Sequence, residues 1–76
     1  MSDTKYLRPG PSFAIAHLVE ECGEVLTAAG KSQRWGLSSV NPELPAAQQE
    51  TNRAWLLREL DGLEGAIQRV RREIMP

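Results

Sequence analysis

Residues 12–30 read SFAIAHLVEECGEVLTAAG, and this stretch decides the fold. Its apolar residues recur at the three- and four-residue intervals of an amphipathic helix. They are Ile15, Leu18, Val19, Cys22, Val25, Leu26 and Ala29. Ser12 is a natural N-cap and Gly30 can end a helix, so we expect a first helix over residues 12–30.

A second stripe with the same spacing lies near the end of the chain. It is formed by Leu56, Leu60, Leu63, Ile67, Val70 and Ile74. Thr51 or Asn52 can cap its start and Pro76 follows its end, so we expect a second helix over residues 52–74. Residues 31–50 are rich in turn-forming residues, which predicts a loop with one short helical turn.

The domain organisation follows from these elements. Two prolines and a glycine within residues 8–11 exclude a helix there, so we expect residues 1–11 to be an N-terminal tail and residues 12–76 a single domain. No alternating run of β-branched residues predicts a strand. The sequence therefore predicts an all-α fold, an antiparallel helical hairpin of two long helices.

Size and charge limit the partners. A chain of 76 residues buries only about 60% of its unfolded surface, so two helices alone are weakly stable. We therefore expect a homodimer or homotetramer that completes a helix bundle. The net charge of −1 favours neither a nucleic acid polymer nor a membrane as a partner. A single cysteine and the lack of a long apolar run or a signal peptide predict a cytoplasmic protein.

Carboxylates gather on the first predicted helix at Glu20, Glu21 and Glu24. At about 100° per residue, Glu21 and Glu24 lie on the same side of the apolar stripe, one turn apart. Glu20 falls on the opposite flank. Glu21 and Glu24 can therefore point to a common spot, and the alternative is that all three belong to the solvated face of a helix.

The informative carboxylate of the second predicted helix is Glu59. It lies only about 60° from the centre of the apolar stripe, where an unpaired carboxylate is costly. One alternative is a buried pair with an arginine such as Arg34. Three glutamates brought together would raise one another's pKa, and a hard divalent cation removes that penalty. The predicted metal ligands are Glu21, Glu24 and Glu59, with Glu20 and Asp61 as weaker candidates.

Three segments carry a pattern that extends beyond single residues. They are Leu18-Val19-Glu20-Glu21-Cys22-Gly23-Glu24-Val25, Gly30-Lys31-Ser32-Gln33-Arg34-Trp35-Gly36-Leu37 and Asn52-Arg53-Ala54-Trp55-Leu56-Leu57-Arg58-Glu59-Leu60. In order and spacing they resemble the MazG-like all-α nucleoside triphosphate pyrophosphatases, in the compact form encoded by phages and their hosts. The resemblance covers residues 13–74, most of the chain.

This resemblance implies an enzyme that depends on Mg²⁺, or on Mn²⁺ in its place. It would cleave a (deoxy)nucleoside triphosphate between the α and β phosphates into a monophosphate and pyrophosphate. In the family, an ExxE on one helix and an ExxD on the next bind the metal. By position these are Glu21 and Glu24 on the first helix and Glu59 on the second, which we expect to be the catalytic residues.

The residues after the first helix are candidates for binding substrate. Lys31 and Arg34 could meet phosphate charge, with loop solvation as the alternative. Trp35 could stack on a base, and closure of the hairpin core is the alternative. His17 is expected on the surface, with metal ligation as the alternative. Cys22 is expected to be a small core residue.

Two departures from the family pattern bear on the activity. Gly62 stands three residues after Glu59, where the family has an aspartate. Asp61 could replace it only if the helix were locally over- or underwound, since it points about 100° away. The family also continues into further helices, which here would come from other subunits. The rival hypotheses are a degenerate nucleotide- or protein-binding module without turnover and a plain helical oligomerisation module.

Overall fold

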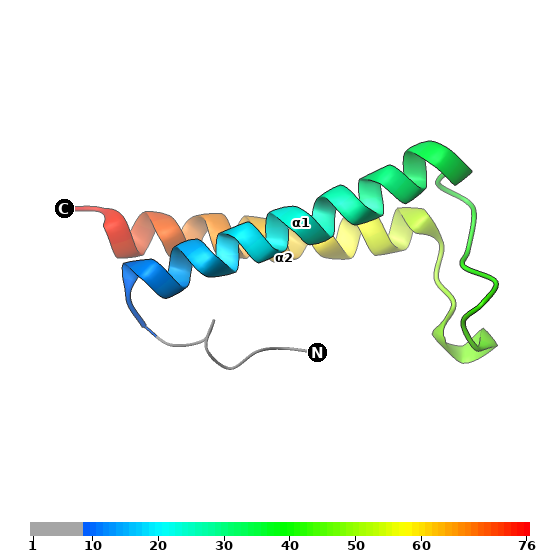
Figure 1. The fold of residues 1–76 in the computed structure, drawn as a ribbon, viewed down its shortest axis with the longest axis horizontal. Helices are drawn as coiled ribbons and strands as arrows, with labels where there is room; N and C mark the ends of the chain where they lie inside the picture. The colour runs from blue at the N-terminus through cyan, green and yellow to red at the C-terminus, as the bar shows by residue number, and fades with distance from the viewer. Residues whose placement is uncertain (1–8) are drawn as a thin grey trace.

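A computed structural model describes residues 9–76 and contains two long helices, α1 (Pro11–Trp35) and α2 (Asn52–Ile74). They run antiparallel and lie side by side along their length (Figure 1). The connection between them contains one short 3₁₀ helix, η2 (Ala46–Gln48). The prediction of an all-α helical hairpin is confirmed. Most of the predicted N-terminal tail, residues 1–8, lies outside the described residues.

The first helix differs from the prediction at both ends. It begins at Pro11 after Gly10, whose φ of 121° is a glycine conformation, so Ser12 is not the N-cap. It also continues through Gly30 to Trp35. A glycine inside a helix weakens it by about 1 kcal/mol but does not end it. The helix ends at Gly36, which has a φ of 96° and donates its N–H to the carbonyl of Ser32.

The second helix has the predicted bounds. Its N-cap is Thr51, whose side-chain oxygen accepts a hydrogen bond of 3.1 Å from the backbone N–H of Ala54. This contact satisfies one of the free amide groups at the helix start. Of the two predicted caps, Thr51 and Asn52, the structure therefore has Thr51. Arg71 and Arg72 lie in the last turn, where positive charge complements the helix dipole.

Asn52 ties the connection to the end of α1. It is 8% exposed, and its Nδ2 donates to the carbonyl oxygens of Gly36 at 2.9 Å and Lys31 at 3.4 Å. Its backbone N–H donates to the carbonyl of Ser39 at 2.8 Å. These bonds fix the start of α2 against the end of α1, although the connection between them is mostly exposed.

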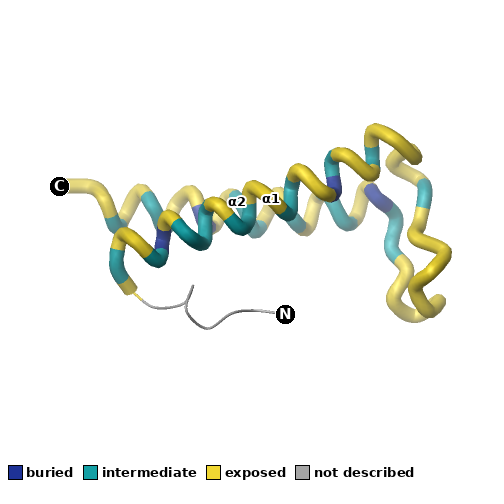
Figure 2. The backbone as a smooth tube through the Cα atoms, in the orientation of Figure 1, coloured by how far each residue is buried: buried dark blue, intermediate teal, exposed yellow. Residues whose placement is uncertain are grey.

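The contact between the helices uses small residues. Among residues 9–76, the buried apolar residues are Ala14, Ala28 and Ala66, and no large side chain is fully buried (Figure 2). Alanines allow the two backbones to approach closely, but they bury little area. Within the described part of the chain, neither helix is long and apolar enough to cross a membrane.

Only one edge of the predicted apolar stripe of α1 meets α2. Val19 and Leu26 are 66% and 72% exposed, and Cys22 is exposed as well. The prediction of a core position for Cys22 is therefore wrong for the single chain. The stripe is wide, and the helix contact lies along one edge of it, on the side of Ala14 and Ala28.

Candidate metal centre

Three carboxylates from the two helices converge at the helix contact. Glu21 and Glu24 come from successive turns of α1 and Glu59 from α2. One carboxylate oxygen from each lies within 4.8 Å of the other two. All three residues are half-buried. The structure thus brings together the three residues that the sequence selects as metal ligands.

Glu59 is held by two groups on its own helix. The indole Nε1 of Trp55, one turn earlier, donates to its Oε2 at 3.1 Å. The Nη1 of Arg58 lies 3.5 Å from the same oxygen, and Arg58 also pairs with Glu50. In the described residues, Glu59 forms an ion pair with an arginine, as the alternative predicted, but the arginine is Arg58 and not Arg34. The four-residue spacing of Trp55 and Glu59 was a signal for this contact.

Glu21 has one oxygen in contact with a histidine and one with no partner. Its Oε1 lies 3.6 Å from Nε2 of His17, whose Nδ1 is in turn 3.3 Å from Nη1 of Arg69. Its Oε2 is buried and accepts no hydrogen bond from any described residue. The His17 side chain is 26% exposed, so His17 lies at the edge of the helix contact, and it is not among the described carboxylate and histidine groups that converge.

Gly62 provides the space for this carboxylate. A Cβ atom at position 62 would lie 2.7 Å from Oε2 of Glu21, so the carboxylate fills the place of the absent side chain. A buried carboxylate oxygen without a hydrogen bond is costly. This oxygen is therefore the atom of the cluster that most needs a donor or a cation.

The pKa of Glu24 is raised to about 7. Burial is the largest cause, followed by repulsion from the charges of Glu21 and Glu59. Near neutral pH, the cluster therefore holds part of a proton in place of a third full charge. A cation among the three carboxylates would remove the repulsion and displace this proton.

The two weaker candidates lie outside the cluster. Asp61 is exposed, and the described carboxylates that converge do not include Glu20. The helix runs without interruption through Gly62, so it is not over- or underwound in a way that would turn Asp61 inward. Because successive residues of a helix are rotated by about 100°, Asp61 and Glu20 point away from the carboxylate cluster.

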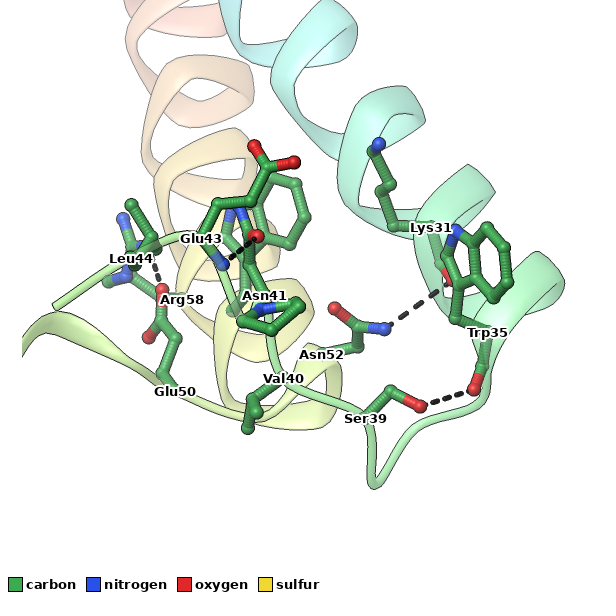
Figure 3. A pocket seen from close by; sticks show the side chains of 12 residues that line it. Lys31, Trp35, Ser39, Val40, Asn41, Glu43, Leu44, Glu50, Asn52 and Arg58 are labelled. Carbon is green, nitrogen blue, oxygen red and sulfur yellow. Dashed lines mark hydrogen bonds and ion pairs between the residues drawn. The ribbon is translucent and has the colours of Figure 1, made fainter. Parts of the chain in front are cut away.

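A cavity of about 600 Å³ lies between the end of α1, the start of α2 and the connection (Figure 3). Lys31 and Trp35 line it from the α1 side and Arg58 from α2, while Arg34 does not line it. Trp35 is 62% exposed, so it does not close the hairpin core. The full lining is Lys31, Trp35, Ser39, Val40, Asn41, Pro42, Glu43, Leu44, Glu50, Asn52, Trp55 and Arg58.

Trp55 and Arg58 connect the cavity to the carboxylates, because both line the cavity and both contact Glu59. Trp55, Arg58 and Asn52 were not predicted as parts of the site from the sequence. Comparison with known proteins identifies no relative: no family model, curated protein or solved structure matches the chain.

Proposed function

We propose that the chain is a MazG-like nucleotide pyrophosphohydrolase of the compact phage and bacterial type. It would use Mg²⁺, or Mn²⁺, to convert a (deoxy)nucleoside triphosphate into a monophosphate and pyrophosphate, as a cytoplasmic homodimer or homotetramer. The observation that carries the proposal is the convergence of Glu21, Glu24 and Glu59 within 4.8 Å from two helices.

Three properties of the cluster fit a hard divalent cation. Its donors are carboxylate oxygens, which Mg²⁺ and Mn²⁺ prefer. The buried Oε2 of Glu21 has no hydrogen bond from a described residue, and the pKa of Glu24 is raised by its neighbours. A bound Mg²⁺ would neutralise these charges, bind phosphate oxygens and lower the pKa of a coordinated water.

The cavity beside the cluster could hold the rest of a nucleotide. Lys31 brings positive charge to its wall, where Arg58 is paired with Glu50, and Trp35 offers an exposed indole on which a base could stack. Trp55 donates to Glu59 from the same wall, so it would orient a metal ligand while bordering the substrate.

Release of pyrophosphate from a panel of ribo- and deoxynucleoside triphosphates, with Mg²⁺ and with EDTA, tests the proposal. We expect Mg²⁺-dependent release that Glu24→Gln and Glu59→Gln abolish. Glu20→Gln is the matched control, because Glu20 lies on the same helix but outside the cluster. Silence of the wild-type protein across the whole panel would refute the enzyme.

Gly62 favours a second candidate, a degenerate module that binds a nucleotide or a protein without turnover. The glycine leaves three acids where the resemblance implies four. In that case Mg²⁺ and a nucleotide would raise the melting temperature without releasing pyrophosphate. An intact oligomer that responds to neither would instead indicate a plain oligomerisation module, and Glu59→Gln would then stabilise the protein.

A further inference from the structure

His17 lies between a carboxylate of the cluster and an arginine of the other helix. Its Nδ1 is 3.3 Å from Nη1 of Arg69 on α2, and its Nε2 is 3.6 Å from Oε1 of Glu21, one turn further along α1. All three residues are half-buried. The histidine therefore connects α2 to Glu21 by a second path, beside the contact of Glu21 with Gly62.

The contact with Arg69 fixes which nitrogen of the His17 ring carries the hydrogen. A guanidinium has donors only, so the N–H of Arg69 donates and Nδ1 of His17 accepts. An imidazole that accepts at one nitrogen carries its hydrogen on the other. Nε2 therefore presents an N–H group on the side of Glu21, and it has no lone pair to offer a metal ion.

The two oxygens of the Glu21 carboxylate then have different surroundings. Oε1 lies near the Nε2–H of His17, whereas Oε2 lies against Gly62 and accepts no hydrogen bond from a described residue. The 3.6 Å from Nε2 to Oε1 is somewhat longer than an N–H···O hydrogen bond, and a small rotation of the glutamate side chain closes the gap. A donor at Oε1 leaves Oε2 free for a cation.

We propose that His17 is a positioning residue for Glu21: Arg69 holds the ring at Nδ1, and the Nε2–H orients the carboxylate so that Oε2 binds the divalent cation. Loss of a group that contacts a metal ligand, and not the metal, commonly weakens metal binding by about 10–100-fold. The positive charge of Arg69 polarises the ring and strengthens its N–H as a donor. The proposal rests on the metal site of the proposed function but not on nucleotide hydrolysis.

Two substitutions of His17 separate the roles of its two nitrogens. The amide nitrogen of a glutamine can take the place of Nε2, whereas the amide of an asparagine reaches only to the place of Nδ1. In calorimetric titrations we expect His17→Asn to weaken Mg²⁺ binding by about 10-fold or more, and His17→Gln to stay within about 3-fold of the wild type. Circular dichroism and urea unfolding check that both variants are folded. Equal losses of Mg²⁺ affinity in the two variants would show that His17 only fills space.

A nitrogen NMR spectrum of the ring tests the hydrogen assignment directly, because His17 is the only histidine of the chain. Above neutral pH we expect the hydrogen on Nε2 and a hydrogen-bonded Nδ1, both in the metal-free protein and with Mg²⁺. Arg69→Met should move the Nδ1 resonance toward that of a ring nitrogen without a hydrogen bond. Arg72→Met is the matched control: it removes an exposed arginine one turn further along α2, and both resonances should stay in place.

Three results would overturn the proposal. They are a hydrogen on Nδ1 in the metal-free protein, loss of the Nε2 hydrogen when Mg²⁺ binds, and wild-type Mg²⁺ affinity in His17→Asn. The proposed function fails by a different result. A wild-type protein that binds Mg²⁺ but releases no pyrophosphate would refute the enzyme and leave the role of His17 intact, whereas one that binds no Mg²⁺ would refute both.

Discussion

A Cβ atom on Gly62 would lie 2.7 Å from Oε2 of Glu21, closer than Cβ atoms approach other atoms in proteins. The Glu21 carboxylate therefore packs directly on the backbone of α2. The resemblance to MazG-like proteins implies an acid at position 62. In this chain a glycine stands in its place and allows the Glu21 carboxylate from the opposite helix to come closer.

Gly62→Ala should displace the Glu21 carboxylate and weaken Mg²⁺ binding about 10-fold, the effect typical of groups that orient metal ligands. The fold should survive, because the end of a glutamate side chain can move.

Gly65→Ala is the matched control. Nothing lies within 4 Å of a Cβ there, so the free energy of unfolding should rise by about 1 kcal/mol with Mg²⁺ affinity unchanged. Calorimetric Mg²⁺ titration and urea unfolding measure both. Equal Mg²⁺ affinity in the two variants would contradict the argument.

The raised pKa of Glu24 predicts a pH dependence of stability. Between pH 4.5 and about 7, the unfolded chain loses the Glu24 proton before the folded chain does. The metal-free protein should therefore become less stable as pH rises through this window. Glu24→Gln should flatten the change, whereas Glu20→Gln should keep it. Urea unfolding in EDTA across the window measures the effect.

The same proton predicts the pH dependence of metal binding. Mg²⁺ must displace the Glu24 proton, so it should raise the melting temperature more at about pH 8 than at about pH 6. The difference should vanish in Glu24→Gln. An equal Mg²⁺ effect at both pH values in the wild-type protein would show that Glu24 is not a ligand.

The two tryptophans should report on different parts of the site. In Trp35→Phe, the remaining indole of Trp55 is bonded to Glu59, so its emission should change when Mg²⁺ is added. In Trp55→Phe, the exposed Trp35 should not respond to Mg²⁺ alone but should respond to a nucleotide in the cavity. Fluorescence titration of both variants tests this. A change in Trp35 emission when Mg²⁺ is added without a nucleotide would contradict it.

Asn52→Ala should lower the free energy of unfolding by about 1 kcal/mol, because it removes the side-chain donor from two part-buried hydrogen bonds to the carbonyl groups of Lys31 and Gly36. Asn41→Ala is the control, since Asn41 is exposed and its side chain accepts only a local bond from the backbone of Glu43. Urea unfolding compares the two. Equal losses would show that the burial of Asn52 has no special role.

The sequence was sufficient for elements with strong local signals. The bounds of α2 follow from the cap at Thr51 and a regular apolar stripe. Helical rotation places Glu21 and Glu24 on one side of α1 and Glu59 near the apolar side of α2, whereas the register that brings them together comes from the helix pairing. The end of α1 did not follow, because Gly30 and Gly36 are both glycines and only their φ angles distinguish an interior position from a helix end.

Other features depend on tertiary contacts that a one-helix projection does not contain. The apolar stripe of α1 is wide enough for two contacts, so its centre did not reveal which edge meets α2. Asn52 has its role because residues 31 and 36 lie beside it only after the hairpin closes. The relation of Glu21 to Gly62 depends in the same way on the register between the helices.

The carboxylate cluster lies between two segments that are far apart in the sequence but adjacent in space. A cation bound to Glu24 and Glu59 would therefore act as a reversible cross-link across the hairpin, closing the long loop between them as a disulfide would. Removal of the cation by a chelator would loosen the helix pairing as well as empty the site. The concentration of the free metal ion would in this way determine what fraction of the chains is folded.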